Sequence, residues 1–166
     1  MGAPPLRELY EKDYYLWVQE NVKLLKNREF HLVDWENLLE EIEGMGRTLY
    51  IAMLRQMRTI MESLYKWENF QSHPETDDWV EEISRARREL REIFEDSPSL
   101  KAIAQNKDTL QRAWKLTTYA LADWLTLPPN KALSVSHFKG KLPTEEDFPQ
   151  ECPYNFQQVM EYKPWT

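Results

Sequence analysis

Residues 34–71 read DWENLLEEIEGMGRTLYIAMLRQMRTIMESLYKWENFQ, and this stretch decides the fold of the chain. At about 100° per residue, its apolar side chains all fall on one broad face of a helix. They are Trp35, Leu38, Leu39, Ile42, Met45, Leu49, Met53, Met57, Ile60, Met61, Leu64 and Trp67. A stripe that keeps its phase for so long needs a partner surface of similar length. The pattern predicts an all-α fold, an elongated antiparallel bundle of helices.

Two glycines, Gly44 and Gly46, lie within this stretch without changing its phase. A straight helix over residues 35–70 would span about 54 Å, whereas a compact chain of this size is about 40 Å across. The length favours a break at the glycines, but the continuous phase favours one helix, with at most a bend there. Gly44 should project outward. Gly46 should face the core, where its missing side chain allows a neighbouring helix to come close.

Three more main helices are predicted, over residues 13–26, 77–94 and 98–125, and Pro153 should open a short last helix over residues 154–162. Asp13 and Asp34 are the expected N-caps of the first helix and the long one, because a carboxylate there accepts amide hydrogen bonds that the first turn leaves open. The buried edge of the first helix should consist of Tyr14, Trp17, Leu24 and Leu25. We expect residues 1–5 to be a flexible start, residues 126–151 an extended loop region, and residues 1–166 a single helical domain.

The composition narrows the class of protein. No stretch approaches the roughly 20 apolar residues that a membrane span needs, and no signal peptide is expected at the N-terminus. The only cysteine, Cys152, forms no disulfide within the chain, which fits the cytoplasm. The net charge of −7 argues against a nucleic-acid binder. The basic residues Arg85, Arg87, Arg88 and Arg91 alternate with glutamates, which indicates a solvated face with ion pairs.

Four segments together resemble a known bacterial family. They are LYEKDYYLWVQENVKLL (9–25), DWENLLEEIEGMGR (34–47), DSPSL (96–100) and FPQECPY (148–154). In this order they resemble the domain-of-unknown-function family twenty-nine, which is all-helical and common in cyanobacteria. The resemblance implies a helical bacterial protein and carries over no catalytic residue. The segment 130–142 is longer than the resemblance leads us to expect.

Carboxylates on the long helix are the first candidates for a metal site. Glu36, Glu40 and Glu43 line one flank of it, and Glu41 lies on the other. Helical di-iron proteins complete such a set with Glu-x-x-His pairs, and no such pair occurs in this sequence. We interpret the carboxylates as a solvated boundary near the positive end of the helix dipole. A cation site made of carboxylates alone stays open as an alternative.

Two further candidates have a plain structural interpretation beside a functional one. His31 and Asp34 have a spacing that suits joint metal ligation, but a loop histidine followed by an N-cap is the more common arrangement. Cys152 precedes Pro153 near an expected helix start, where a thiolate would be favoured, but a buried structural cysteine is the more common arrangement. The tryptophans come at helical spacing and are predicted core residues: Trp17, Trp35, Trp67, Trp79, Trp114 and Trp124.

The sequence favours a non-enzymatic cytoplasmic protein that works through protein contacts, with an unidentified partner or as a homodimer. No catalytic set and no cofactor motif is present. A metal-dependent enzyme that uses the carboxylates of the long helix is one alternative. A nucleic-acid-associated regulator is another, with Lys131, His137, Lys139 and Lys141 as a small basic loop.

Overall fold

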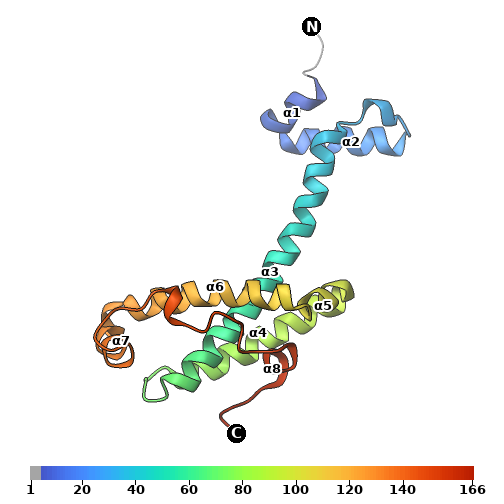
Figure 1. Ribbon diagram of the computed structural model, residues 1–166. Helices are drawn as coiled ribbons and strands as arrows, with labels where there is room; N and C mark the ends of the chain where they lie inside the picture. Colours follow the sequence, from blue (N-terminus) through green and yellow to red (C-terminus); the bar gives the residue numbers. More distant parts are fainter. Residues whose placement is uncertain (1–4) are drawn as a thin grey trace. The chain divides into compact units, whose positions relative to one another are not determined.

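A computed structural model describes residues 5–166, and every regular element in this part of the chain is helical (Figure 1). The expected all-α fold is confirmed. The α-helices are α1 (Leu6–Lys12), α2 (Tyr14–Lys26), α3 (Trp35–Asn69), α4 (Thr76–Asp96), α5 (Pro98–Ala104), α6 (Lys107–Thr126), α7 (Lys131–His137) and α8 (Phe156–Glu161). Three short 3-10 helices are η1 (Phe30–Leu32), η2 (Pro128–Asn130) and η3 (Glu145–Asp147). Most of the expected flexible start, residues 1–4, lies outside the described residues.

The chain divides into two compact units, which we call unit 1, up to Leu49, and unit 2, from Tyr50 onward. The helix α3 continues through Gly44 and Gly46 as predicted and contributes residues to both units. The prediction of one domain over residues 1–166 stays a prediction, which the number of unfolding transitions would test. The four-helix bundle stays a prediction as well.

Unit 1 consists of α1, α2, η1 and the first turns of α3. The Asp13 side chain accepts a hydrogen bond from the Leu16 amide at 3.0 Å, which confirms Asp13 as the N-cap of α2. Trp17 is buried, and its ring meets that of Tyr10 edge-on at 4.9 Å. Tyr14 was expected to be buried but is half exposed: one side of its ring stacks on Trp17 at 5.5 Å, and its hydroxyl donates to Glu41 at the surface.

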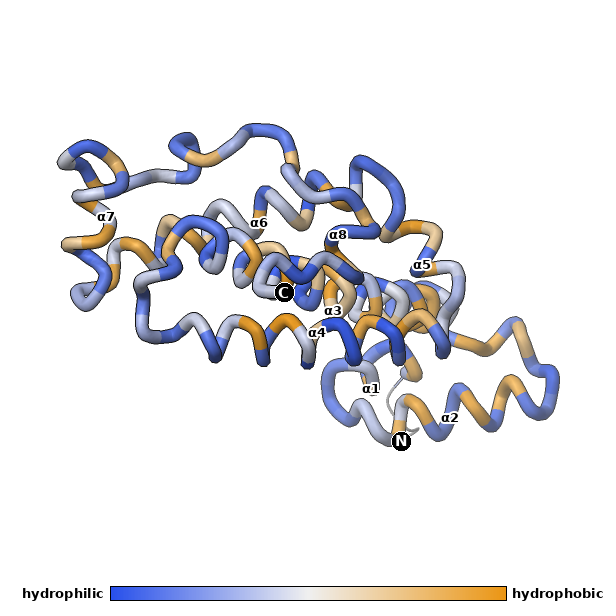
Figure 2. Tube along the Cα trace, turned by 90° about the horizontal axis from the view of Figure 1, so that it is seen from below, coloured by the Kyte–Doolittle hydropathy of each residue, from blue (hydrophilic) through white to orange (hydrophobic). Residues whose placement is uncertain are grey.

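Unit 2 has its core where α3, α4 and α6 meet. The core residues of α3 are Met53, Met57, Ile60, Met61 and Leu64, all with no exposed surface. Ile83 and Leu90 of α4 and Leu121 and Leu125 of α6 complete the centre of this cluster. Hydrophobic and hydrophilic residues alternate along α4, so that one face is available for this core (Figure 2).

The prediction of one continuous helix over residues 98–125 is wrong, because the structure has two helices there, α5 and α6. The chain turns at Gln105 and Asn106, where Asn106 adopts an extended conformation and its amide closes a turn onto the Ile103 carbonyl at 3.1 Å. Asparagine favours such turns because its side chain competes for backbone hydrogen bonds. The apolar spacing of three and four happens to continue across the turn, so periodicity alone joined the two helices.

The extended loop expected over residues 126–151 is also wrong. This region contains η2, α7 and η3, and Ser134 of α7 is fully buried. Helices of three to seven residues are too short to show a period in sequence. The last helix begins at Phe156 and not at Pro153. Asn155 is its N-cap, in a capping box with Gln158 at 2.8 and 2.9 Å.

Arg87 contradicts the solvated face expected for the basic residues of α4. Arg85, Arg88 and Arg91 are exposed, whereas Arg87 is only 4% exposed. Its guanidinium donates to the carbonyl oxygens of Val159 at 2.8 Å, Gln158 at 3.0 Å and Tyr162 at 2.7 Å. The last carbonyls of a helix lack partners within it, so Arg87 caps α8 and ties it to α4. Burial lowers the pKa of Arg87 to about 10, and the side chain stays protonated at neutral pH.

Candidate interaction surface

The apolar stripe of α3 is covered in unit 2 and open in unit 1. We call the open part the exposed stripe. It consists of Trp35, Leu39, Ile42, Met45 and Leu49, whose exposed fractions run from 45% to 66%. Leu38, which borders the stripe, is half-buried. A contiguous set of large apolar side chains on a helix face is typical of a contact surface.

Gly46 lies within the exposed stripe by its helical phase but does not face a core. A methyl group added at Gly46 would have no atom within 4 Å. The expected close contact with a neighbouring helix is therefore wrong for this chain, because the stripe around Gly46 is uncovered. At Gly44 an added methyl would meet only the Arg47 side chain, at 3.8 Å.

Polar contacts within unit 1 hold the start of α3 in place. The Asp34 carboxylate accepts hydrogen bonds from the Trp17 indole at 2.9 Å and from the Asn37 side chain at 2.8 Å. The Asp34 amide donates to the side chain of the buried Asn21 at 3.0 Å. Burial alone would raise the pKa of Asp34, but the hydrogen bonds from Asn37 and Trp17 outweigh it and lower the pKa. The helix begins at the next residue, Trp35, as predicted.

The flank of α3 that carries Glu41 faces α1 and α2. The hydroxyl groups of Tyr10 and Tyr14 both donate to the Glu41 carboxylate. These two hydrogen bonds lower the pKa of Glu41. The hydrogen bond between Tyr10 and Glu41 also raises the pKa of Tyr10 to about 12. One flank of the helix is therefore used inside unit 1, and the exposed stripe lies beside it.

The structure does not bring the metal candidates together. Glu36 pairs with Arg7 at 3.3 Å on the surface, and Glu40 and Glu43 are exposed. His31 is exposed in η1, while Asp34 is engaged by Trp17 and Asn37. Between Pro5 and Thr166, no group of three or more His, Cys, Asp or Glu side chains is arranged to hold a metal ion.

Cys152 has the surroundings of a structural cysteine. It is half-buried, and its thiol donates to the Tyr154 carbonyl oxygen at 3.2 Å. Burial raises the pKa of the thiol, which disfavours the thiolate. The nearest following helix, α8, begins at Phe156 and has Asn155 as its N-cap.

The tryptophans mostly lie in the core, as predicted. Trp17, Trp79 and Trp114 are buried, and Trp67 and Trp124 are half-buried. Trp35 is the exception, since it lies in the exposed stripe with its indole N–H donating to the Phe30 carbonyl at 2.7 Å.

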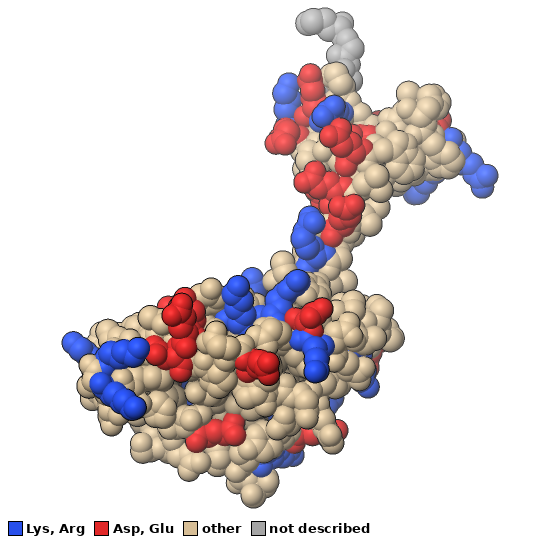
Figure 3. Space-filling view, viewed as in Figure 1, with Lys and Arg blue, Asp and Glu red and all other residues tan. Residues whose placement is uncertain are grey.

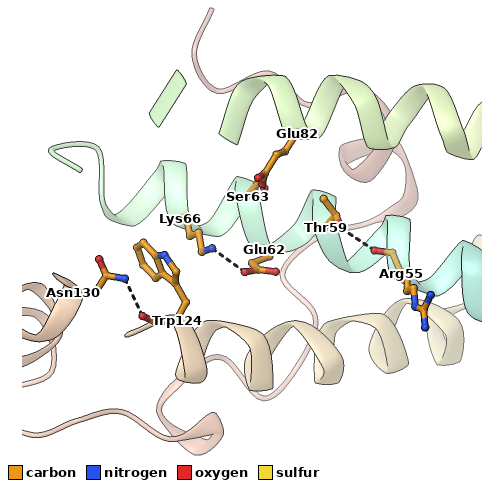
Figure 4. A network of polar contacts seen from close by, with 8 residues as sticks. All are labelled: Arg55, Thr59, Glu62, Ser63, Lys66, Glu82, Trp124 and Asn130. Atoms are coloured by element: carbon orange, nitrogen blue, oxygen red, sulfur yellow. Dashed lines mark hydrogen bonds and ion pairs between the residues drawn. The ribbon is translucent and has the colours of Figure 1, made fainter. Parts of the chain in front are cut away.

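A polar cluster in unit 2, which sequence reasoning missed, surrounds Lys66 (Figure 4). The ammonium group of this buried lysine donates to Glu62 at 2.8 Å and lies 4.4 Å above the Trp124 ring. On the neighbouring turn, the buried Ser63 donates to Glu82 of α4 at 3.0 Å. The only signal in the sequence is the four-residue spacing of Glu62 and Lys66, which is usual on solvated helices.

A cavity of about 550 Å³ adjoins this cluster and is lined by Lys66, His73, Trp79, Glu82 and Trp124, among others. His73 accepts at Nδ1 from the Glu75 amide at 3.2 Å, so its Nε2 carries the proton and donates to Asn130 at 2.9 Å. Asn130 in turn donates to the Trp124 carbonyl at 2.9 Å. His73 and Asn130 bond to each other, and Lys66 and Glu82 bond to Glu62 and Ser63 outside the lining, so these polar groups are engaged in a structural network.

Within residues 5–166, none of the helices combines the length and the apolar character that crossing a membrane requires.

Comparison with known proteins agrees with the resemblance found in the sequence. The model of the family described as "Domain of unknown function DUF29" matches residues 9–165, nearly the whole chain. The chain belongs to this family. No curated protein and no solved structure matches it.

Proposed function

We propose that this member of the DUF29 family is a non-enzymatic protein that acts through protein–protein contacts, and that the exposed stripe of α3 is its contact surface. The observation that supports the proposal is the exposure of five large apolar side chains at helical spacing on one face. Burying such a side chain from full exposure is worth about 1.5–3 kcal/mol. Each side chain of the stripe is still about half exposed, so a partner that covers the stripe gains part of this free energy at each of the five residues.

Contacts within unit 1 hold the exposed stripe in place, and this strengthens the proposal. The contacts of Asp34 with Trp17 and Asn37, and of Glu41 with two tyrosines, hold α3 against α1 and α2. A surface held by its own scaffold loses little conformational entropy on binding. We place the protein in the cytoplasm, which is consistent with its single cysteine.

The two alternatives have less support. A metal-dependent enzyme would need the carboxylates of α3 to converge, yet Glu36 pairs with Arg7 and Glu41 binds two tyrosines. A nucleic-acid-associated regulator would use the basic residues near α7, but Lys141 pairs with Asp147 at 3.0 Å.

The test is the size of the protein's assembly in an extract of its own cells, measured by size-exclusion chromatography with immunodetection. We compare the wild type with a double variant, Ile42→Asp and Leu49→Asp, and with the control Leu142→Asp, which changes an equally exposed leucine in unit 2. We expect the wild type and the control to elute as a larger assembly and the stripe variant as the 20.0 kDa protomer.

Circular dichroism of the three purified proteins shows whether the variants keep their helices. An assembly that survives both stripe substitutions, or a wild type that elutes as the protomer, would contradict the proposed function.

A further inference from the structure

We infer that a hollow between α4 and α8 binds a small phosphate monoester whose organic part is apolar. The phosphate accepts hydrogen bonds from Arg88, Arg91 and the unused end of the Arg87 guanidinium, and the organic part lies against aromatic side chains next to them. This site belongs to unit 2 and does not involve the exposed stripe, so the inference goes beyond the proposed function. We call the hollow the basic hollow; its lining includes Arg87, Arg88, Arg91, Met160, Glu161 and Lys163.

Arg87 is a buried arginine that keeps part of its donor capacity unused. A guanidinium has five N–H groups. The Nε atom donates to Val159, and Nη2 donates to both Gln158 and Tyr162. Among residues 5–166, Nη1 has no hydrogen-bond partner, although Arg87 is only 4% exposed. Because Arg87 lines the basic hollow, which has a volume of about 520 Å³, the two N–H groups of Nη1 are assigned to a ligand there.

The other cations of the basic hollow are also without a counterion. In the part of the chain that the structure describes, the ion pairs involve Arg7, Lys12, Lys66 and Lys141, and none involves a cation of this hollow. Of the described residues, only Glu161 brings a carboxylate to the lining. Figure 3 shows basic and acidic side chains interspersed on the visible face of unit 2, whereas the basic hollow concentrates positive charge in a protein of net charge −7.

Two of these cations repel each other in the folded protein. Burial is the main cause of the lowered pKa of Arg87, and the positive charge of Arg91 lowers this pKa further, while Glu161 raises it. Like charges that are close together without a counterion cost free energy. An anion that contacts both Arg87 and Arg91 replaces this repulsion with attraction. The planar donors of arginine match the oxygens of phosphate, with two parallel hydrogen bonds for each side chain.

The amount of positive charge favours a phosphate monoester over a carboxylate. A phosphate monoester carries a charge of about −1.5 to −2 at pH 7 and has three acceptor oxygens. It can therefore contact Arg87, Arg88 and Arg91 together and balance more of their charge than a carboxylate, which carries a single charge. The flexible Lys163 side chain adds a further cation at the rim, since it is exposed.

A second hollow provides room for the organic part of the ligand. It has a volume of about 390 Å³ and shares Arg91, Met160 and Glu161 with the basic hollow, so the two adjoin. Two aromatic side chains, one acidic residue and one basic residue complete its lining: Phe94, Phe156, Glu95 and Lys101. The rings of Phe94 and Phe156 lie 6.1 Å apart. An apolar group attached to the phosphate buries its surface against these rings and Met160.

The experiment is isothermal titration calorimetry of the purified full-length protein in a buffer free of phosphate. An ionic strength of about 0.1 M screens charges that lie more than about 10 Å from the ligand. The probes are phenyl phosphate, inorganic phosphate and benzoate. Phenyl phosphate should bind about 5-fold more tightly than inorganic phosphate, because its ring buries apolar surface. It should also bind more tightly than benzoate, which has the same ring and a single charge.

Substitutions locate the site. Arg88→Gln with Arg91→Gln removes two cations from the basic hollow and should raise the dissociation constant of phenyl phosphate by about 10-fold. Glu161→Gln removes the opposing carboxylate and should lower that constant by about 2-fold. Arg85→Gln is the matched control, because Arg85 is an exposed arginine of α4 outside the basic hollow. All of these residues are exposed, and circular dichroism checks that each variant keeps its helices.

Each outcome bears on the inference. Weaker binding in the double variant, tighter binding in Glu161→Gln and unchanged binding in Arg85→Gln support the basic hollow as the site. No detectable binding of phenyl phosphate at millimolar concentration would overturn the inference. An equal loss of affinity in Arg85→Gln and in the double variant would show a general attraction to α4 and would overturn the location. Equal affinities for phenyl phosphate and inorganic phosphate would overturn the apolar part of the ligand.

Discussion

The two halves of α3 have the same spacing of apolar residues, but one half is buried and the other is exposed. From Met53 to Leu64, the apolar side chains are covered by α4 and α6 and have almost no exposed surface. From Trp35 to Leu49, side chains of the same kind and spacing are about half exposed. A helical stripe thus shows that a face is available for packing, and the supply of neighbouring elements determines whether the same chain covers it.

The sharpest test of this contrast is a matched pair of substitutions, Ile60→Asp in the covered half and Ile42→Asp in the open half. Ile60 is fully buried, so a carboxylate there has no solvent and should lower the free energy of unfolding by more than about 4 kcal/mol. Ile42 is more than half exposed, and Ile42→Asp should change that free energy by less than about 0.5 kcal/mol.

Urea denaturation of both variants, at concentrations where the protein is a monomer, measures the difference. Losses of similar size at the two positions would show that the open half is covered in solution.

The core that covers α3 from Met53 to Leu64 also includes Val159 of α8, and Arg87 holds α8 against α4. Arg87→Ala leaves the carbonyls of Val159 and Tyr162 without the Arg87 donor, while Gln158 keeps its hydrogen bond from the Tyr162 amide, and should cost about 3 kcal/mol. The neighbouring Arg88→Ala is the control, because Arg88 is exposed and its removal should cost less than about 0.5 kcal/mol. Thermal melts of the two variants compare them, and equal melting temperatures would contradict the capping role of Arg87.

The stability of the start of α3 should depend on pH through Asp34. Because the pKa of Asp34 is lowered in the folded protein, its ionised carboxylate stabilises the fold above the pKa of the unfolded chain. This stabilisation is lost as the pH falls through the pKa of the folded protein. Asp34→Ala removes the acceptor for Trp17 and Asn37 and should cost about 1–2 kcal/mol near pH 7. The cost should shrink near pH 3.

Denaturation of the wild type and of Asp34→Ala at both pH values measures this. Asp34→Asn serves as the control, since it keeps a side-chain oxygen but cannot titrate. A cost of Asp34→Ala that is the same at both pH values would show that the ionised carboxylate is not what stabilises the helix start.

The smallest effect is expected at the glycines of the open half. With no atom within 4 Å of an added methyl, Gly46→Ala should stabilise the monomer by about 0.5–1 kcal/mol through its higher helix propensity. Gly44→Ala should do the same, since its new methyl makes only an ordinary contact with Arg47. Helix content against temperature, measured on dilute protein, tests both. A loss of stability in Gly46→Ala alone would place a neighbouring element over the exposed stripe.

Local features were predictable from the sequence because their causes are local. The period of α3 across Gly44 and Gly46, the cap at Asp13 and the helix start after Asp34 follow from interactions within a few residues. The same reasoning failed where a local signal was weak or misleading. It joined α5 and α6 across Asn106, and it missed α7, which is too short to show a period.

Tertiary structure alone decided which groups are covered. Arg87 shares the charge pattern of its exposed neighbours, yet the carbonyls of α8, more than 70 residues away, draw it into the interior. Lys66 is buried because Trp124 lies beneath its ammonium group. Ile42 and Ile60 are equivalent in period and differ in burial. Helical period and capping depend on residues close by along the chain. Burial depends on which distant segments pack against a residue, and a single sequence contains no local signal for that packing.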